Sequence, residues 1–317
     1  MQKVRIVAPS DSINKGIDLS KIEKYFKKLG YELTLGKYIY DKSKYYDCAE
    51  IFKRVEDLMD AFKDNEVKII ICADGGYNVN QILPYLDYEI MKNNPKIIIG
   101  YSDITALLNA IYAKTNMITY LGPMITSFSS NDKYTLNYFE KILNYNSFTI
   151  KSSKYICNSE GNILYKNDGM KIINKGYAEG LIVGGNLCTL NLLQGTSYIP
   201  NLKNAILFIE DDADDFKNDV FFKEFDRNLE SLLQNDINIK GLVIGRFEEC
   251  ANMSFDKLKM CLKNKEKLKD IPIVCGVNFG HTYPNLTLPI GGYVKINIRD
   301  NNIKIEIKYE KIKENEI

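Results

Sequence analysis

The sequence of 317 residues has no tryptophan and only one histidine, His281. Catalytic zinc sites of the common hydrolases use two or three imidazoles, so a single histidine excludes a conventional catalytic zinc. The seven cysteines are scattered and form no Cys-x-x-Cys pair, which predicts reduced thiols and offers no substitute metal cluster. If an imidazole acts as a general base in this protein, it belongs to His281.

An excess of charge of one sign and a long apolar run are also missing. The 42 Lys and Arg residues nearly balance the 41 Asp and Glu residues, which leaves a formal charge of +1. This balance predicts no nucleic-acid and no membrane partner, and leaves a small molecule or a short peptide as the ligand. Val4–Ala8 is too short for the apolar core of a signal peptide, and no run reaches about 18 apolar residues. We therefore expect a soluble, cytoplasmic protein.

The order of apolar runs predicts an α/β fold. Val67–Cys72 and Lys96–Ile99 are short β-branched runs that end near glycines and precede helical patterns, as in βα units on a parallel sheet. The periodic spacing of apolar residues weakens between residues 127 and 175, and we place a domain boundary in this segment. The expected domains are an N-terminal parallel-sheet domain, 1–150, and a second α/β domain, 151–317. The second half has further apolar runs at Leu181–Val183, Ala205–Ile209, Gly241–Ile244 and Ile271–Cys275.

Ser102 lies between an apolar strand and a helical run. The segment Gly100–Thr105 resembles a nucleophile elbow, although Ile104 replaces the final glycine of the Gly-x-Ser-x-Gly pattern. Ser102 or Asp103 would equally serve as the N-cap of the following helix, since both residue types are preferred caps. The two interpretations are compatible.

A second turn with exposed backbone N–H groups is expected directly after the strand that ends at Cys72. Gly75 and Gly76, in the segment Asp74–Asn78, stand where ligands bind at the carboxyl edge of open α/β sheets. Such N–H groups form an oxyanion site only if a nucleophile lies beside them. A plain tight turn is the alternative.

A carboxylate and the histidine also follow apolar strands. Glu210 ends one strand and begins an acidic stretch that runs to Asp215, so it can orient a histidine or help to hold Mg²⁺ or Ca²⁺. A solvated acidic loop is the alternative. His281 lies on a glycine-rich loop between Gly280 and Pro284, where a structural or surface histidine is the alternative.

Taken together, Ser102, Glu210 and His281 supply a hydroxyl nucleophile, an orienting carboxylate and an imidazole base. These groups are the full set needed for acyl transfer, and each follows the end of an apolar strand. A serine hydrolase is therefore favoured. A non-catalytic α/β ligand-binding protein and a metal site at Glu210–Asp215 stay open.

Six motifs strengthen this hypothesis because they resemble those of the serine LD-carboxypeptidase family, and within it most closely the microcin C self-immunity branch. The resemblance implies that Ser102 is the nucleophile, that Glu210 orients His281, and that N–H groups near Gly75, Gly76 and Asp103 form the oxyanion hole. It also implies a metal-independent enzyme without a cofactor, commonly a homodimer. The motifs are Gly75–Asn78, Gly100–Ala106, Gly184–Leu190, Phe208–Asp211, Gly245–Phe247 and Gly280–Thr282.

The resemblance also bears on the substrate. Murein-cutting members typically read Arg-Gly-Gly-Tyr-Gly where this chain has Asp74–Asn78, and His-Gly-Pro where it has Leu121–Pro123. The immunity branch hydrolyses aminoacyl or peptidyl nucleotides and often stacks the base on a tryptophan, so an aromatic residue in 127–175 would have to replace it here. An LD-carboxypeptidase of murein tetrapeptide recycling is the alternative.

Hydrolysis beside an acidic residue requires donors for the carboxylate of the substrate. The candidates for contacting the substrate are Tyr77, Asn78, Asn186 and Arg246, together with the N–H groups of the glycine turn. Because Asp74 replaces the arginine expected in murein-cutting relatives, we expect an aspartyl or glutamyl sulfamoyl adenylate to be cleaved better than an LD-tetrapeptide.

Overall fold

The computed structural model describes residues 1–130, 132–213, 220–234 and 238–310. The first half of the chain forms a six-stranded sheet with the strand order β14-β5-β4-β3-β1-β2. All neighbouring strands of this sheet are parallel except β14, which runs antiparallel to β5. The strands are β1 (Lys3–Val7), β2 (Glu32–Leu35), β3 (Val67–Cys72), β4 (Ile97–Gly100), β5 (Thr119–Leu121) and β14 (Leu288–Ile290).

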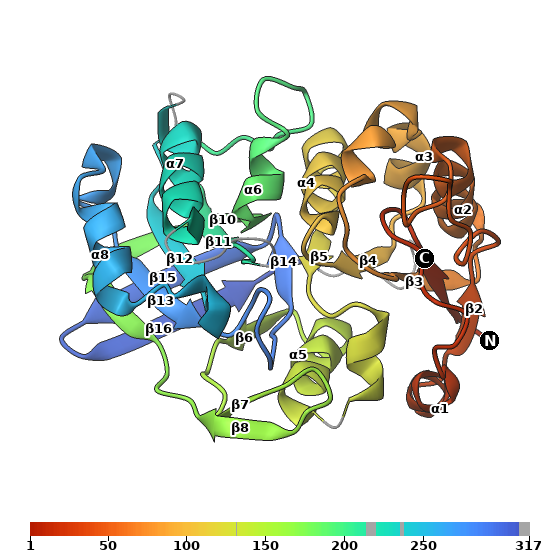
Figure 1. Cartoon of the computed structure of the whole chain (residues 1–317), viewed down its shortest axis with the longest axis horizontal. Helices are drawn as coiled ribbons and strands as arrows, with labels where there is room; N and C mark the ends of the chain where they lie inside the picture. Colours follow the sequence, from red (N-terminus) through yellow and green to blue (C-terminus); the bar gives the residue numbers. More distant parts are fainter. Residues whose placement is uncertain (131, 214–219, 235–237, 311–317) are drawn as a thin grey trace.

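Helices cover both faces of this sheet, with α2, α3 and α4 on one side and α1 and α5 on the other (Figure 1). The β-branched run of β3 is almost wholly buried, as expected for a parallel strand covered on both faces. The helices are α1 (Ser20–Lys28), α2 (Ile51–Lys63), α3 (Tyr88–Asn93), α4 (Ile104–Thr115) and α5 (Lys133–Asn144), with short 3-10 turns η1 (Val79–Gln81), η2 (Leu83–Tyr85) and η3 (Ile125–Ser129).

The second half forms an eight-stranded sheet with the order β6-β16-β15-β10-β11-β12-β13-β9. Its centre, β10 to β13, is parallel, and antiparallel strands extend it on both sides. Its strands are β6 (Ser147–Thr149), β9 (Lys171–Asn174), β10 (Gly176–Asn186), β11 (Ile206–Glu210), β12 (Gly241–Gly245), β13 (Ile273–Val277), β15 (Tyr293–Arg299) and β16 (Asn302–Lys308). Its helices are α6 (Leu187–Asn191), α7 (Val220–Gln234) and α8 (Phe255–Lys263), with 3-10 turns η4 (Glu249–Ala251) and η5 (Glu266–Leu268).

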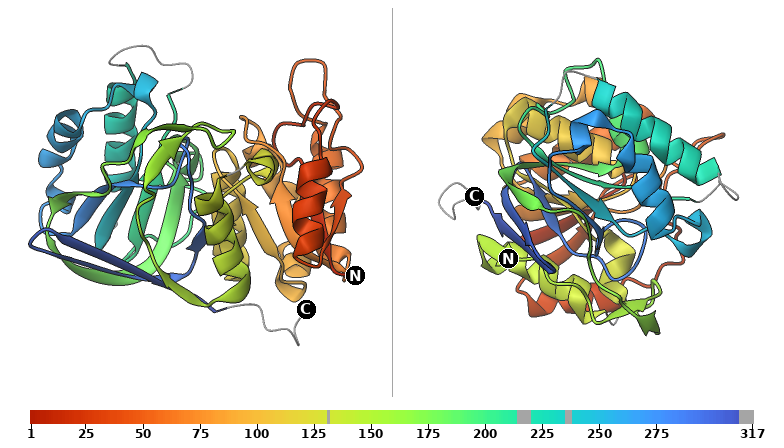
Figure 2. Two further views of the ribbon diagram at one scale, coloured as in Figure 1. Left: turned by 90° about the horizontal axis from the view of Figure 1, so that it is seen from below. Right: turned by 90° about the vertical axis from the view of Figure 1, so that its left-hand side faces the viewer.

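The predicted α/β architecture with parallel strands in both halves is confirmed. The two halves lie side by side (Figure 2) and exchange strands: β6 precedes residue 150 but pairs with β16, whereas β14 joins the first sheet. The boundary at residue 150 stays a prediction. The segment 127–175 is more ordered than its weak periodicity indicated, since it also holds the hairpin of β7 (Tyr155–Cys157) and β8 (Ile163–Lys166).

Helix α4 joins the two halves, and Ser102 lies just before its first turn. The helix packs against β10 and α6, and its residues from Ile104 to Ile111 are all buried. The Asn109 side chain donates a hydrogen bond to the Gly184 carbonyl at 2.8 Å, so β10 is held against α4. In the described part of the chain, no helix has the length and apolar character needed to cross a membrane.

Candidate active site

Ser102 lies in the sharp turn between β4 and α4, as the strand-turn-helix pattern predicts. Its φ angle is +61°, a conformation that residues other than glycine seldom adopt and that is typical of functional positions. Gly100 permits the turn, because a Cβ there would lie 2.8 Å from Ile104 Cγ2 and 3.0 Å from Cys72 Cβ. The turn therefore holds the Ser102 side chain at the carboxyl edge of the first sheet.

The structure bears on the prediction that Ser102 or Asp103 is the N-cap of the helix that follows. Asp103 occupies the N-cap position of α4, but its carboxylate makes no capping hydrogen bond to the helix. It accepts instead from Ser10 Oγ at 2.5 Å and from the Val79 N–H at 2.8 Å. Burial raises the pKa of this carboxyl. Asp103 thus binds the segments of Ser10 and Val79 to the Ser102 turn. These segments are distant in the sequence and become neighbours only in the fold.

The structure brings Ser102, Glu210 and His281 into one chain of hydrogen-bonding groups. His281 Nδ1 lies 2.7 Å from Glu210 Oε2, and His281 Nε2 lies 3.0 Å from Ser102 Oγ. Glu210 is fully buried at the end of β11, while 14% of the His281 side chain is exposed. The imidazole can therefore accept the Ser102 proton at Nε2 while Nδ1–H donates to Glu210.

Two glycines allow the backbone to approach Glu210 this closely. A Cβ at Gly280 would lie 2.7 Å from Glu210 Oε2, and one at Gly245 would lie 2.9 Å from Glu210 Cβ. Burial lowers the pKa of His281, but the charge and hydrogen bond of Glu210 outweigh it and raise the pKa to about 9. The buried carboxylate thus stabilises the protonated imidazole that forms when Ser102 loses its proton.

The glycine turn lies against Ser102. A Cβ at Gly75 would lie 3.0 Å from Ser102 Oγ and 4.0 Å from the Asp103 nitrogen. The Gly75 N–H donates to Asp74 Oδ1 at 2.9 Å, whereas no group of the described residues accepts from the Asp103 N–H. Gly76 has a φ of +133°, and a Cβ there would collide with Asp11. Of the predicted oxyanion donors, the N–H groups of Asp103 and Gly76 therefore have no acceptor among the described residues.

Two of the predicted substrate-binding residues have structural roles instead. Asn186 is only 2% exposed: its Oδ1 accepts from the Thr189 N–H to cap α6, and its Nδ2 donates to Asp212. Asn78 is 8% exposed, and its Oδ1 accepts from Gln81. Both amides are engaged within the fold, and the substrate contacts of these side chains stay predictions.

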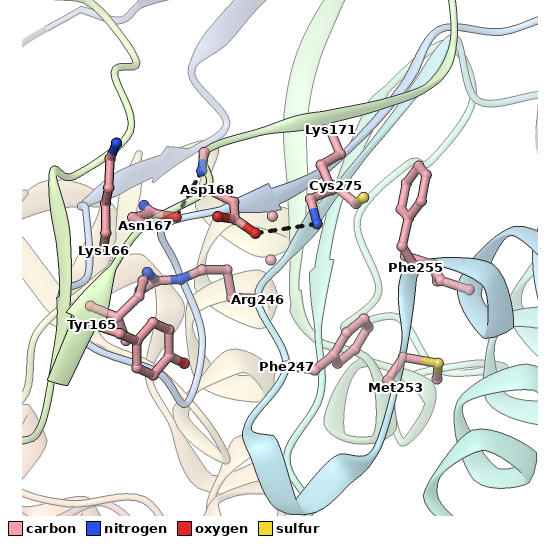
Figure 3. A pocket seen from close by; sticks show the side chains of 15 residues that line it. Tyr165, Lys166, Asn167, Asp168, Lys171, Arg246, Phe247, Met253, Phe255 and Cys275 are labelled. Carbon is pink, nitrogen blue, oxygen red and sulfur yellow. Dashed lines mark hydrogen bonds and ion pairs between the residues drawn. The ribbon is translucent and has the colours of Figure 1, made fainter.

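Tyr77 and Arg246 have different placements. Tyr77 is 74% exposed and directly follows Gly76, so it lies at the edge of the site. Arg246 instead lines a separate cavity, shown in Figure 3, which none of the three triad candidates lines. The prediction that Arg246 binds a substrate carboxylate beside Ser102 is therefore not supported by its position.

Negative charge surrounds the candidate triad. The charges that raise the pKa of His281 come from Glu210, Asp212 and Glu248. Asp11 lies against Gly76, and burial followed by the neighbouring carboxylates raises its pKa. The described surroundings thus favour a cationic group on the substrate.

The acidic stretch after β11 can be assessed only in part, because Asp214 and Asp215 lie outside the described residues. Asp211 is buried, and burial raises its pKa well above the usual value. Within residues 1–130, 132–213, 220–234 and 238–310, no three His, Cys, Asp or Glu side chains form a group that could hold a metal ion.

Two aromatic neighbours of His281 were not anticipated from the sequence. The Tyr101 ring meets the imidazole edge-on with 5.3 Å between ring centroids, and the Tyr101 hydroxyl lies 3.4 Å from that of Tyr283. Tyr101 directly precedes Ser102, and Tyr283 lies two residues after His281. Proximity in the chain to the candidate residues was the only available signal.

Comparison with known proteins places the chain in a family. Residues 4–122 match the LD-carboxypeptidase N-terminal domain, and residues 179–296 match the LD-carboxypeptidase C-terminal domain. The protein YocD of Bacillus subtilis (strain 168) is 41% identical and is aligned over 96% of each chain. The chain belongs to the LD-carboxypeptidase family. The resemblance inferred from the six motifs is thereby confirmed.

Other LD-carboxypeptidase relatives have names that describe different substrates. The microcin C7 self-immunity protein MccF of Escherichia coli is 33% identical over 90% of this chain and 87% of its own. A solved MccF-like protein of Bacillus anthracis str. Ames has a TM-score of 0.92 at 38% identity, covering 98% of this chain and 97% of its own. MccF in complex with aspartyl sulfamoyl adenosine has a TM-score of 0.83 at 29% identity, with the same coverage. A muramoyltetrapeptide carboxypeptidase of Oxalobacter formigenes has a TM-score of 0.78 at 26% identity, covering 98% of this chain and 100% of its own.

Proposed function

We propose that this LD-carboxypeptidase family member is a serine hydrolase with Ser102 as nucleophile, His281 as general base and Glu210 as the residue that orients the histidine. The main support is that His281 Nε2 lies 3.0 Å from Ser102 Oγ while His281 Nδ1 lies 2.7 Å from Glu210 Oε2. A non-catalytic binding protein would have no need for a buried carboxylate paired with the only histidine.

In the proposed reaction, Ser102 Oγ attacks the carbonyl carbon of the scissile bond while His281 Nε2 takes its proton. The tetrahedral intermediate collapses when His281 returns that proton to the leaving nitrogen, and the acyl group stays on Ser102. A water molecule then attacks the ester in the same way, which releases the acid and restores Ser102. The free Asp103 N–H supports a role as donor to the oxyanion.

The substrate class that we favour is an amide between an aminoacyl or peptidyl group and a nucleotide-like moiety. Support comes from the 33% identity to MccF, one solved structure of which contains aspartyl sulfamoyl adenosine. Asp74, which replaces the arginine typical of murein-cutting members, also supports this class.

The charges around the site suggest which part of such a substrate is recognised. Asp11, Asp212 and Glu248 supply negative charge around the glycine turn and His281, so they would attract the free ammonium group of an aminoacyl substrate. The substrate carboxylate has fewer donors than expected, since the Asn186 amide is already engaged.

Tyr77 is the aromatic residue that we propose for stacking on a base, and an aromatic residue from segment 127–175 is the alternative. It is 74% exposed and follows Gly76, which adjoins the Ser102 turn. Stacking on an aromatic ring contributes about 1 to 3 kcal/mol per base, which a tyrosine can supply in a chain without tryptophan. Tyr77→Ala should raise the KM for a sulfamoyl adenylate by about tenfold or more, whereas Tyr77→Phe should leave the KM unchanged. Tyr177→Ala, which removes an exposed ring from β10, is the control.

An LD-carboxypeptidase of murein peptides is the second candidate. The similarity to the muramoyltetrapeptide carboxypeptidase fold, with a TM-score of 0.78, favours it. Cytoplasmic location and a homodimeric state belong to both versions of the proposal, and sedimentation of the purified chain tests the latter.

The experiment that tests the proposal is hydrolysis of a substrate panel by the purified protein. The panel contains aspartyl and glutamyl sulfamoyl adenylates, an LD-tetrapeptide and simple dipeptides, with Ser102→Ala as the inactive control. We expect the sulfamoyl adenylates to give the highest kcat/KM. A higher kcat/KM for the LD-tetrapeptide would contradict the proposed substrate class but not the proposed triad. If the protein hydrolyses no member of the panel, both the substrate class and the triad are rejected.

A further inference from the structure

A second cavity lies beside the β7–β8 hairpin and outside the candidate triad. It has a volume of about 290 Å³, close to the lower end of roughly 300 to 1,000 Å³ that is usual for small-molecule sites. The carboxyl ends of β12 and β13, the start of α8 and the segment from Tyr165 to Lys171 surround it. None of Ser102, Glu210 and His281 lines it.

Arg246 supplies this cavity with an unsatisfied cation. Its Nη2 donates to the Pro284 carbonyl at 2.9 Å, but Nε and Nη1 are buried and have no hydrogen-bond partner among the described residues. Burial lowers the pKa of Arg246 to about 10, so the guanidinium remains charged at neutral pH. A buried charge with two free donors is costly unless an acceptor reaches it. Nε–H and Nη1 lie on different edges of the planar guanidinium, so each can donate a separate hydrogen bond to an oxygen of a carboxylate or a phosphate.

The rest of the cavity divides into a charged end and an apolar end. Figure 3 shows Arg246 extended toward Tyr165, while Phe247, Met253 and Phe255 lie together at the opposite end. Tyr165 is 57% exposed, so its ring can move from the guanidinium without opening the core.

Charge in the cavity is positive on balance. Lys166 and Lys171 line it together with Arg246, and Asp168 is the only acidic residue in its lining. Lys171 Nζ lies 3.7 Å from Asp168 Oδ2 in an exposed ion pair. Such a pair contributes little to stability, so Lys171 can pair with an anionic ligand instead. A negatively charged ligand is therefore favoured over a neutral or cationic one.

We propose that this cavity is a second ligand site, separate from the Ser102 site, for a small organic anion that carries an aromatic ring. The anionic group accepts a hydrogen bond from the Arg246 guanidinium once the exposed Tyr165 ring moves aside, and the ring of the ligand lies against Phe247 and Phe255. Because Arg246 also donates to the carbonyl of Pro284, three residues beyond His281, it connects the proposed ligand site to the segment that carries the candidate base.

The chain itself makes a direct binding measurement possible. Because it has no tryptophan, the fluorescence of a naphthalene ligand can be followed against a weak protein background. The probes are 1-naphthyl phosphate and 1-naphthoate, which distinguish a phosphate from a carboxylate ligand. Inorganic phosphate and 1-naphthol supply the anion and the ring alone. We expect at least one naphthyl anion to bind at least tenfold more tightly than either part.

Variants assign the binding to this cavity. Arg246→Gln should weaken the naphthyl anion at least tenfold, and Phe255→Ala should weaken it without changing the affinity for inorganic phosphate. Arg299→Gln, on an exposed residue at the end of β15, should have no effect. If Arg246→Gln fails to fold because it loses Pro284, the exposed Lys171→Gln should still weaken the anion severalfold.

Three results would overturn the proposal. The first is that neither naphthyl anion binds, and the second is that Arg246→Gln and Lys171→Gln, as folded proteins, bind them as well as the wild type. The third is that the best substrate of the panel displaces the probe competitively from Ser102→Ala, which would make the cavity part of the substrate site. The first two tests use no turnover, so they stand even if the proposed reaction fails.

Discussion

The backbone of Gly75 packs directly against the side chain of Ser102, so that a methyl group at Gly75 would lie 3.0 Å from both Cβ and Oγ of the serine. This gap is too short for ordinary contact. Gly75 does not need a left-handed conformation, so its lack of a side chain serves this approach and not the local backbone.

Gly75→Ala should therefore lower kcat/KM by about 100-fold, since a displacement of even 1 Å at a reacting group has an effect of that size. The melting temperature should change little. Gly16→Ala is the matched control, because a Cβ there meets no atom within 4 Å. Unchanged kinetics in Gly75→Ala would show that the reacting group does not lie beside this glycine.

Ser102→Ala should leave folding intact and lower kcat by roughly 10⁴ or more, because its hydroxyl bonds His281 and does not cap α4. His281→Ala should be similarly severe. The double variant should be scarcely slower than either single one, since the two residues act in one step. Ser129→Ala, which removes a hydroxyl that donates to the Thr126 carbonyl, is the control. Losses that multiply in the double variant would contradict a common step.

The rate should depend on the neutral form of His281. With a pKa raised to about 9, kcat/KM should increase with pH and level off above about 9. Glu210→Gln removes the charge that raises this pKa, so burial should then move the inflection to lower pH. Glu306→Gln, on remote β16, should leave it in place. A profile that is flat from pH 5 to 9 would contradict the imidazole base.

The same ion pair links pH to stability. Because the folded pKa of His281 lies above its ordinary value of 6.5, the pair stabilises the fold fully below pH 6.5 and loses this effect as pH rises toward about 9. Glu210→Gln should flatten this part of the stability curve, as measured by urea unfolding at several pH values.

A free ammonium group on the substrate should matter. Asp11, Asp212 and Glu248 place negative charge around the site, so N-acetylation of an aminoacyl substrate should lower kcat/KM by about tenfold or more, chiefly through KM. Asp11→Asn should reduce the difference between the two substrates. Equal kinetics for the free and acetylated forms would argue against recognition of the ammonium group.

Chelation should have no effect on turnover. The proposed steps need only one imidazole, one carboxylate and one hydroxyl, so EDTA should leave kcat unchanged. Activity that is lost in EDTA and restored by Mg²⁺ or Ca²⁺ would favour the acidic stretch from Glu210 to Asp215 as a metal site.

Much of the fold and of the candidate site was readable from local patterns. Runs such as Val67–Cys72 are long, β-branched and bounded by turns, so period and composition identify them as buried strands. The candidate triad was also accessible, because a single histidine leaves no choice of imidazole and chemistry then restricts the partners. The motifs that resemble those of the LD-carboxypeptidase family contain Ser102, Glu210 and His281 and therefore indicated the same three residues independently.

The partners of individual side chains could not be read in this way. Asp103 looked like a helix cap, yet it bonds Ser10, 93 positions away, because the fold brings two donors closer to it than the helix N–H groups. Asn186 and Arg246 looked available to a substrate, but one amide is engaged in capping α6 and the guanidinium extends into another cavity.

The sequence by itself thus determined the element types, the likeness to a family and the one possible imidazole, because these depend on residue type and short-range periodicity. Only the tertiary structure decided that His281 Nε2 lies 3.0 Å from Ser102 Oγ, that Glu210 is wholly buried and that Arg246 Nε and Nη1 have no partner among the described residues. Distances of this kind depend on how two sheets pack through α4, and packing is set by the whole chain at once.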